Sequence, residues 1–252
     1  MSQNGHLKPT LEVRGISKSF GAIQAVREVS FEVYPGEILG VIGPNGCGKT
    51  TLFNCILGQL KPDSGSVILN GANITRLSSS ARSRSGLGRT FQLLQVFDSM
   101  KVTENLLTAA QAHVGTVWDR LFRPPDLGMG GEVKRVAEQF RLGHLRREIA
   151  KNLSFGQQKL LDIGMGLMSG PQIVFLDEPA GGVNLSMLTD VKQQLLELNR
   201  EGTTFVVIEH NMEFIFEVAH RILVMAEGQV LIIGSAEEVR NDSRVIEAYL
   251  GH

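Results

Sequence analysis

A glycine-rich stretch carries the strongest chemical pattern in the sequence. It reads Gly43-Pro44-Asn45-Gly46-Cys47-Gly48-Lys49-Thr50-Thr51 and matches the phosphate-loop pattern G-x-x-x-x-G-K-[ST]. Glycines let the backbone curl so that several N–H groups point inward, where they can bind a polyphosphate. In such a loop Lys49 neutralises the β and γ phosphates, and the Thr50 hydroxyl is a ligand for Mg²⁺. The expected nucleotide-binding residues here are Gly43, Asn45, Gly46, Gly48, Lys49, Thr50 and Thr51.

A pair of carboxylates follows an apolar run further along the chain. Asp177 and Glu178 come directly after residues 173–176, which have the composition of a buried strand. We expect Asp177 to hold Mg²⁺ through water, and Glu178 to orient or deprotonate the attacking water. A solvated acidic pair at a strand end is the alternative, and the phosphate loop elsewhere in the chain argues against it.

The elements that must position these residues alternate between strands and helices. The first 36 residues alternate polar and apolar side chains in short runs, which predicts an antiparallel β entry. The expected buried strands are residues 38–42, 173–176 and 204–208, and the expected helices next to them are residues 51–60 and 188–198. This order predicts an α/β fold with a mostly parallel core sheet covered on both faces.

Two other segments have a helical pattern. Residues 103–168 are expected to form a helical lobe, interrupted by a long loop at Arg123-Pro124-Pro125 and at Gly128-Met129-Gly130-Gly131. Residues 236–250 predict two short helices at the end of the chain.

A hexapeptide before the acidic pair narrows the class of phosphate-loop enzyme. It reads Leu153-Ser154-Phe155-Gly156-Gln157-Gln158. With it the sequence resembles the ATP-binding subunits of ABC transporters, whose signature motif is usually Leu-Ser-Gly-Gly-Gln. The resemblance implies that Ser154, Gly156 and Gln157 bind the γ-phosphate of a nucleotide held by an opposite subunit, identical or similar, in a head-to-tail dimer. Ser154 is also a good helix N-cap, so a purely structural role is the alternative.

Three further residues match landmarks of that family. The resemblance implies that Phe20 stacks on adenine, that Gln92 contacts Mg²⁺ and links the lobe to the catalytic core, and that His210 hydrogen-bonds the γ-phosphate. The alternative for Phe20 is an ordinary core residue. Without the resemblance, Gln92 would be expected on the surface and His210 at a strand end.

The resemblance also implies the fold, the domain plan and the reaction. The fold is the P-loop NTPase fold of ABC ATPases, with an antiparallel β subdomain and an inserted helical lobe. Residues 1–252 form a single ATP-binding domain, in which 1–91 and 170–252 are the catalytic core and 92–169 the lobe with the signature. The reaction is hydrolysis of ATP to ADP and phosphate, coupled to transport.

Two departures from the usual motifs point to a narrower branch. Phe155 replaces the first glycine of the signature, and Asn184 stands where many relatives have Asp at the dimer seam. Together with Gly88-Arg89-Thr90-Phe91-Gln92, a long insertion at 111–131 and the ending Ala248-Tyr249-Leu250-Gly251, they resemble the branched-chain amino acid importer ATPases. Branches for urea, short amides or lipopolysaccharide export share much of this pattern. A soluble ABC ATPase without a transport role is the alternative from another class.

Composition limits the partners. A formal net charge of -1 gives no bulk positive field, so a nucleic-acid partner is not expected. No apolar run approaches the roughly 20 residues of a membrane helix, and residues 1–9 do not resemble a secretory signal. We therefore expect a cytoplasmic chain attached peripherally to the inner or plasma membrane through permease subunits, with a solute-binding protein taking part indirectly. Two cysteines, too few for a disulfide framework, fit a reducing compartment.

Two local expectations follow. Residues 93–100 form an apolar cluster that in relatives belongs to a groove receiving a helix of the membrane subunit, so part of Leu93, Val96, Phe97 and Met100 should be exposed; the alternative is that they pack inside the lobe. Cys47 lies beside Lys49 and a helix N-terminus, so we expect an acidified thiol that maleimide modifies and ATP protects.

Overall fold

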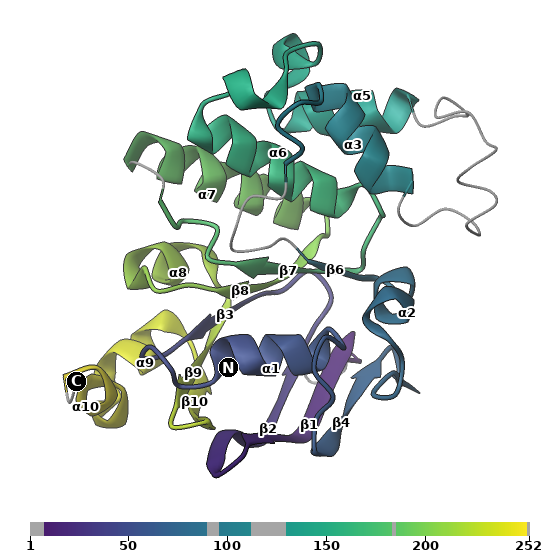
Figure 1. The fold of residues 1–252 in the computed structure, drawn as a ribbon. Coiled ribbons are helices and arrows are strands. Elements are labelled where there is room, and N and C mark those ends of the chain that lie inside the picture. The colour runs from purple at the N-terminus through teal and green to yellow at the C-terminus, as the bar shows by residue number, and fades with distance from the viewer. Residues whose placement is uncertain (1–7, 90–95, 112–129, 183–184, 251–252) are drawn as a thin grey trace. The chain divides into compact units, whose positions relative to one another are not determined.

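The computed structural model describes residues 8–89, 96–111, 130–182 and 185–250 (Figure 1). They belong to two compact units, one within Met1–Arg82 and Leu198–His252 and the other within Ser83–Glu197. Across the described ranges, no helix is both long enough and apolar enough to cross a bilayer. The division into core and lobe at residues 92 and 169 stays a prediction.

An antiparallel sheet opens the first unit. Strand β1 (Leu11–Phe20) pairs with β2 (Ile23–Val33) on one side and with β4 (Ser64–Leu69) on the other, and β5 (Ala72–Asn73) follows at the β4 edge. In the second half of β2, buried and exposed residues mostly alternate, as in a sheet with one covered face. The predicted antiparallel entry is confirmed.

Parallel strands carry the phosphate loop. Strand β3 (Ile38–Ile42) lies between β8 (Thr204–Ile208) and β9 (Arg221–Ala226) and runs parallel to both. Every residue of β3 and β8 is buried, as the continuous apolar sequence predicts. The predicted strands at 38–42 and 204–208 are confirmed.

A C-terminal hairpin adds to the predicted fold. Strand β10 (Gln229–Gly234) pairs antiparallel with β9. The turn between them is Glu227-Gly228, and both residues have positive φ (48° and 81°). Positive φ at both central residues is the geometry of the tightest hairpin turns. No strand was predicted at residues 229–234.

Five helices accompany these sheets among the described residues of the first unit: α1 (Lys49–Ile56), α2 (Ser79–Arg84), α8 (Met212–Val218), α9 (Ala236–Asn241) and α10 (Ser243–Leu250). Helix α1 starts inside the phosphate loop. At its other end the buried Arg82 guanidinium donates to the carbonyl oxygens of Cys55 (2.7 Å) and Ile56, which leaves these terminal helix groups satisfied. Helices α9 and α10 confirm the two short helices predicted at the end of the chain, and they lie beside the β9–β10 hairpin (Figure 1).

The second unit combines two parallel strands with helices. Strand β6 (Leu87–Arg89) pairs with β7 (Ile173–Asp177), which confirms the strand predicted at 173–176. The helices are α3 (Val102–Gln111), α5 (Gly130–Gln139), α6 (Phe155–Leu167) and α7 (Leu185–Arg200), with short 3₁₀ turns at Gly143–Leu145 and Ala150–Asn152. The predicted helix at 188–198 lies within α7.

One expectation about the lobe is wrong. Gly130 and Gly131 form the first turn of α5, although a break was expected there. The N–H groups of a first turn have no partner inside the helix anyway, so glycine disturbs it less there than in a helix interior. The rest of the expected loop, including Arg123-Pro124-Pro125, lies outside the described residues.

Candidate nucleotide site

The backbone of the phosphate loop requires glycine for two separate reasons. Gly43, Gly46 and Gly48 have positive φ values of 154°, 78° and 103°. A Cβ at Gly43 would lie 2.1 Å from the Met225 carbonyl oxygen, and one at Gly48 would lie 2.1 Å from the Ala25 carbonyl oxygen. Gly46, by contrast, has open space around it. Two of the three glycines are therefore fixed by both conformation and contact.

Lys49 is folded into the curl of the loop. Its side chain is buried, and Nζ donates to the carbonyl oxygens of Gly43 (2.7 Å) and Pro44 (2.9 Å). Asn45 and Thr50 of the same loop are exposed. The Lys49 ammonium is therefore held only by neutral carbonyl oxygens, and other residues of the loop remain accessible to solvent. This arrangement fits a binding site for an anionic ligand.

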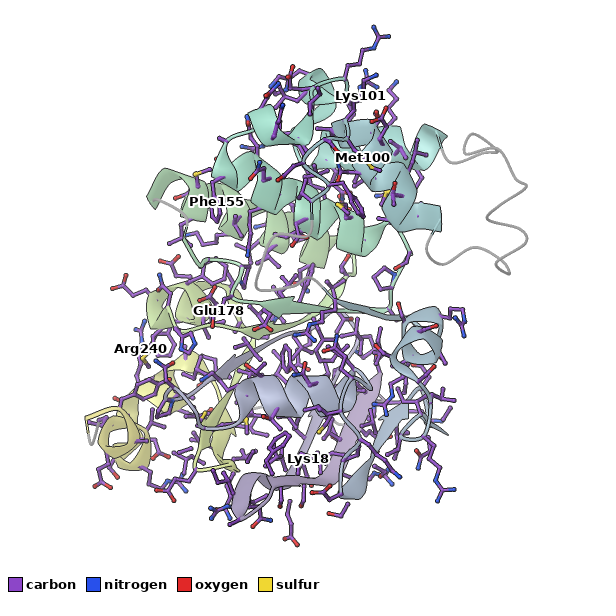
Figure 2. All side chains as sticks on the ribbon, in the orientation of Figure 1. Lys18, Met100, Lys101, Phe155, Glu178 and Arg240 are labelled. Carbon is purple, nitrogen blue, oxygen red and sulfur yellow. The ribbon has the colours of Figure 1, made fainter. Side chains whose placement is uncertain are left out.

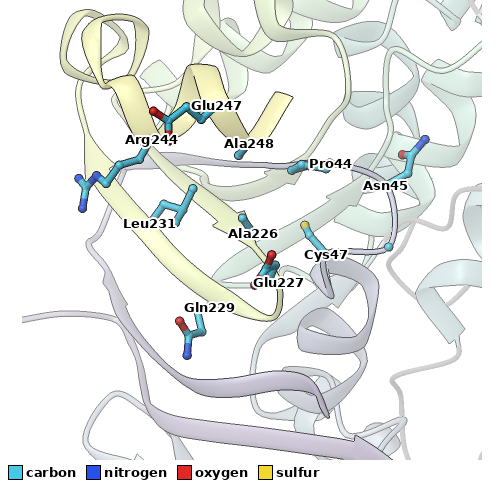
Figure 3. Close-up of a pocket in the computed structure, with 11 residues that line it drawn as sticks. Pro44, Asn45, Cys47, Ala226, Glu227, Gln229, Leu231, Arg244, Glu247 and Ala248 are labelled. Atoms are coloured by element: carbon cyan, nitrogen blue, oxygen red, sulfur yellow. The ribbon is translucent and has the colours of Figure 1, made fainter. Parts of the chain in front are cut away.

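Two hollows border the loop. One, of about 460 Å³, lies between the loop, the β9–β10 hairpin and α10, and the close-up in Figure 3 shows Cys47 and Glu227 facing it. The other, of about 320 Å³, is lined by Gly43, Pro44, Asn45, His210, Ala248 and Tyr249. The phosphate loop and His210 therefore line one cavity, together with Tyr249. The hydrogen bond of His210 to a γ-phosphate stays a prediction.

The predicted acidic thiol in the loop is wrong. Cys47 is buried, and burial raises the pKa of its thiol above the ordinary value; the nearby Lys49 ammonium offsets only part of that rise. Desolvation of the thiolate outweighs the attraction of one cation here. Burial likewise raises the pKa of the Cys55 thiol to about 11. A protonated, shielded thiol reacts slowly with maleimide.

His210 follows β8 and is exposed. The preceding residue, Glu209, is buried, and its carboxylate accepts the backbone N–H groups of His210 (3.0 Å) and Asn211 (3.3 Å). This carboxylate fixes the turn that presents the imidazole. Glu209 could have been noticed in the sequence, because it is an acidic residue directly between the predicted strand and His210. No role was predicted for it.

Phe20 ends β1 with 49% of its surface exposed, so the alternative of a core residue is wrong. The Lys18 ammonium lies 5.7 Å from the centre of the Phe20 ring and pairs with Asp63 (2.8 Å). An exposed aromatic ring is available for stacking. Its contact with adenine stays a prediction.

Asp177 ends β7 and is buried. Its Oδ2 accepts from Arg89 Nη2 of β6 (3.0 Å), whereas its Oδ1 is buried and accepts no hydrogen bond from any described residue. A buried carboxylate oxygen without a donor is costly, and it suits a hard cation or a water bound to one. The alternative of a solvated pair is wrong for Asp177, and its partner Arg89 was not predicted.

Glu178 is held in an unusual backbone conformation directly after the strand. Its φ is 51°, which is rare for a residue with a side chain, and its carbonyl oxygen accepts the Gly181 N–H (3.0 Å). Strained backbone of this kind tends to occur at functional sites. Figure 2 shows the half-buried Glu178 just beyond the end of β7.

The signature segment starts α6. Ser154 is the N-cap: its Oγ accepts the Gln157 N–H (3.3 Å), and the Gln157 side chain accepts the Ser154 N–H (2.9 Å). Gly156 is buried, and a Cβ there would lie 1.8 Å from Met187 Cε. Ser154 and Phe155 are exposed, and Figure 2 shows Phe155 at the start of the helix. The structural role of Ser154 is confirmed, and its role toward a nucleotide stays a prediction.

Some predicted residues lie outside the described ones: Gln92, Leu93 and Asn184. Of the predicted docking cluster, Phe97 is 45% exposed, and Val96 and Met100 are half-buried, so partial exposure is confirmed. No group of three or more His, Cys, Asp or Glu side chains suits a metal ion within the described part of the chain.

Comparison with known sequences gives two family matches. The model of the ABC transporter family matches residues 26–181, and that of the branched-chain amino acid ATP-binding cassette transporter family matches residues 233–252. The chain is 38% identical over 252 residues to the high-affinity branched-chain amino acid transport ATP-binding protein LivG of Escherichia coli, covering 97% of this chain and 98% of that protein. It is 36% identical to BraF of Pseudomonas aeruginosa, which has the same description, with the same coverage.

A solved structure with the same fold is the ADP conformation of MJ1267, described as an ATP-binding cassette of an ABC transporter. It is 34% identical, with a TM-score of 0.88, and the match covers 97% of this chain and all of that one. The predicted fold class is confirmed by this likeness.

Proposed function

Because the chain belongs to the ABC transporter family, we propose that it hydrolyses Mg-ATP as the motor subunit of a branched-chain amino acid importer. It is an ATPase of the transport-coupled kind, and its membrane-spanning partners are separate subunits. The observation that carries the choice of solute is the match of residues 233–252 to the family described as branched-chain amino acid ATP-binding cassette transporter. The similarity to LivG and BraF, both described as branched-chain amino acid transport ATP-binding proteins, supports the same solute.

Phosphate binding would use groups that the loop already orients. Lys49 would exchange its two carbonyl acceptors for phosphate oxygens, and hydrogen bonds between charged partners are roughly twice as strong as neutral ones. The backbone N–H groups of Asn45, Gly46 and Gly48 would bind the phosphates from the curl of the loop. Phe20 would stack on the adenine at the other end of the nucleotide.

Mg²⁺, when bound, spreads the charge that develops on the β and γ phosphate oxygens. The Thr50 hydroxyl and the Asp177 carboxylate would hold it, with Gln92 as a further ligand. Asp177 suits this role because Oδ1 has no competing donor among the described residues, while Arg89 keeps Oδ2 in place.

Hydrolysis would depend on two side chains at the γ-phosphate. Glu178 would orient the attacking water and accept its proton, and His210 would donate a hydrogen bond to the phosphate. The oxygen of the water forms a bond to phosphorus, and the bond to the ADP oxygen breaks. The turn held by Glu209 would keep His210 in position during this step.

A second ATPase subunit would complete each site. Ser154, Gly156 and Gln157 of one subunit would contact the γ-phosphate held by the other, in a head-to-tail dimer. A hydroxyl has one donor and two acceptor lone pairs. Capping of α6 uses only an acceptor of Ser154, so its O–H remains able to donate to phosphate.

Coupling to transport would pass through membrane-spanning permease subunits docked at the cytoplasmic face. The exposed Phe97 is a candidate contact for them. The buried Asn105 side chain accepts the Phe97 N–H (2.7 Å) and donates to the Lys101 carbonyl (3.0 Å), so the segment that carries Phe97 is firmly held. A solute-binding protein outside the membrane would act through the permease.

The test is reconstitution with the membrane subunits in lipid vesicles. Binding protein loaded with leucine should stimulate ATP hydrolysis, and binding protein without solute should not. Glu178→Gln should abolish the stimulated rate and keep ATP binding. Stimulation by urea or a short amide but not by leucine, isoleucine or valine would reject the proposed solute, and a wild-type chain that does not bind Mg-ATP would reject the ATPase itself.

A further inference from the structure

The turn of the C-terminal hairpin is hydrogen-bonded to the phosphate loop. The N–H of Gly228, between β9 and β10, donates to the Cys47 carbonyl oxygen (3.0 Å), and the Gly228 carbonyl oxygen accepts the Arg27 N–H of β2 (2.8 Å). Gly228 is buried, and Figure 3 shows Glu227 of the same turn close to Cys47. The turn therefore bridges the phosphate loop and the antiparallel sheet.

We propose that Gly228 is a positioning residue of the ATP site, whose N–H orients the Cys47–Gly48 peptide unit so that the Gly48 N–H points to the nucleotide phosphates. This inference rests on the proposed ATPase function, in which the Gly48 amide binds phosphate. Gly228 itself does not touch the nucleotide. It gives the C-terminal hairpin, which lies far from the loop along the chain, a part in nucleotide binding.

The geometry of a single peptide unit provides the link. The Cys47 carbonyl and the Gly48 N–H belong to one planar unit, in which the two bonds point in opposite directions. A donor at the carbonyl oxygen therefore fixes the direction of the N–H on the other side. No described residue accepts a hydrogen bond from the Gly48 N–H, so this amide is available to a ligand. The bond to the carbonyl also polarises the peptide unit and makes its N–H a stronger donor.

Strand β2 packs against both the loop and the turn. A Cβ at Gly48 would lie 2.1 Å from the Ala25 carbonyl oxygen, and a Cβ at Gly228 would lie 3.0 Å from the same oxygen. Gly228 also has a φ of 81°, which a residue with a side chain rarely adopts. A side chain at position 228 would therefore push the turn away from β2 and its N–H away from Cys47.

Gly228→Ala introduces that side chain. We expect Mg-ADP and Mg-ATP to bind about three- to tenfold more weakly, which corresponds to the loss of about one hydrogen bond. The KM for ATP should rise by the same factor. By contrast, kcat should change by less than about twofold, because Glu178 and His210 at the γ-phosphate remain.

A second hairpin turn provides the matched control. The turn Asn70-Gly71, between β4 and β5, has φ values of 49° and 78°, against 48° and 81° for Glu227-Gly228. Gly71 is exposed, and a Cβ there would meet no atom within 4 Å. Gly71→Ala therefore introduces the same backbone strain without a contact to the loop. It should lower the Tm and leave nucleotide affinity unchanged.

Calorimetric titration with Mg-ADP and thermal unfolding of the free proteins compare the two variants. Weaker binding in Gly228→Ala alone would support the role of Gly228. Equal affinity of Gly228→Ala and wild type, whatever the Tm, would overturn it. An equal loss of affinity in Gly71→Ala would overturn it as well, because backbone strain alone would then account for the effect.

A measurement on the wild-type chain covers the case in which Gly228→Ala does not fold. Labelling glutamate carbonyls with ¹³C and glycine amides with ¹⁵N selects the Glu-Gly pairs at 201–202 and 227–228. Gly202→Ala, whose Cβ has open space, assigns the two amides. If breaking the Gly228 hydrogen bond weakens nucleotide binding, bound nucleotide must oppose that breakage by the same factor. Saturating Mg-ADP should therefore slow hydrogen exchange at Gly228 about three- to tenfold more than at Gly202.

The exchange experiment separates the two proposals. In a chain that binds Mg-ADP, slowing at Gly228 that does not exceed the slowing at Gly202 would overturn the role of Gly228 alone. A wild-type chain without affinity for Mg-ADP would instead overturn the proposed ATPase function.

Discussion

The glycines of the phosphate loop and the glycine of the signature segment meet different physical demands. Gly43 and Gly48 have positive φ, and a Cβ on either would strike a backbone carbonyl oxygen. Gly156 lies in the first turn of α6 without positive φ, and a Cβ there would strike the far end of the Met187 side chain. Backbone atoms cannot easily move aside, whereas a methionine side chain can.

This difference separates a fixed region from an adaptable one. The loop is held through Lys49 and Gly228 before any ligand arrives. Such preorganisation means that little reorganisation is needed when the phosphates bind. The signature segment instead exposes Ser154 and Phe155, and Met187 lies beside Gly156; such a surface suits the proposed contact with a second subunit.

The largest expected effect separates binding from chemistry. Glu178→Gln should reduce kcat about 10²- to 10⁴-fold, because a general base is lost. Affinity for ATP should stay within about threefold of wild type, because the fixed loop is unchanged. Single-turnover hydrolysis and equilibrium ATP binding measure the two quantities. Hydrolysis that survives in Glu178→Gln at more than a tenth of the wild-type rate would contradict the assignment.

Substituting alanine for Gly48 of the phosphate loop and for Gly156 of the signature segment tests whether the first region is more rigid than the second. Gly48→Ala places a side chain at φ 103° against the Ala25 carbonyl, so we expect a loss of about 2–4 kcal/mol in the free energy of unfolding, with nucleotide affinity reduced as well. Gly156→Ala should cost about 1 kcal/mol or less, because Met187 can turn away. Urea denaturation measures both. Equal losses would show that the two regions are equally rigid.

A second pair of variants separates the two roles of Ser154. Ser154→Ala removes the N-cap of α6 and should cost about 1 kcal/mol of stability, whereas Ser154→Gly should cost only a few tenths of a kcal/mol. Both lack the hydroxyl expected to donate to the γ-phosphate. ATP hydrolysis should therefore fall alike in the two variants although their stability differs. Normal hydrolysis in Ser154→Gly would reduce the role of Ser154 to capping.

Much of the fold and part of the site could be predicted from the sequence. Continuous apolar runs marked β3, β7 and β8, because a strand buried on both faces has no polar positions. The phosphate loop was readable because its chemistry resides in backbone that only glycine permits. The prediction of its ligand-binding residues followed from that pattern and stays a prediction.

Tertiary context decided what the sequence could not show. Arg89 meets Asp177 only because β6 and β7 are adjacent, although 88 positions separate the two residues along the chain. Tyr249 lines one hollow together with Gly43, although the two residues lie far apart along the chain. Cys47 was misjudged because its neighbours in sequence, Lys49 and a helix start, suggested an acidic thiol, whereas the burial that raises its pKa arises only in the folded chain.

The smallest expected effect concerns that thiol. Because the pKa of Cys47 is raised, its thiolate fraction at pH 7 is below that of a free cysteine, and alkylation should be slow. The rate should rise about tenfold per pH unit as the thiolate fraction grows, as long as the protein stays folded. Iodoacetamide labelling followed by mass spectrometry of the Cys47 peptide measures this. Labelling at pH 7 as fast as in the urea-unfolded chain would contradict a shielded loop.

The central claim is that a nucleotide on the loop of one subunit is completed by Ser154 of another. The most direct test is the specific ATPase activity of the chain as its concentration is raised, for wild type and Ser154→Gly. We predict that wild-type activity per subunit rises with concentration as dimers form, and that Ser154→Gly binds ATP but stays inactive throughout. Activity per subunit that is constant at all concentrations and equal in Ser154→Gly would contradict the account.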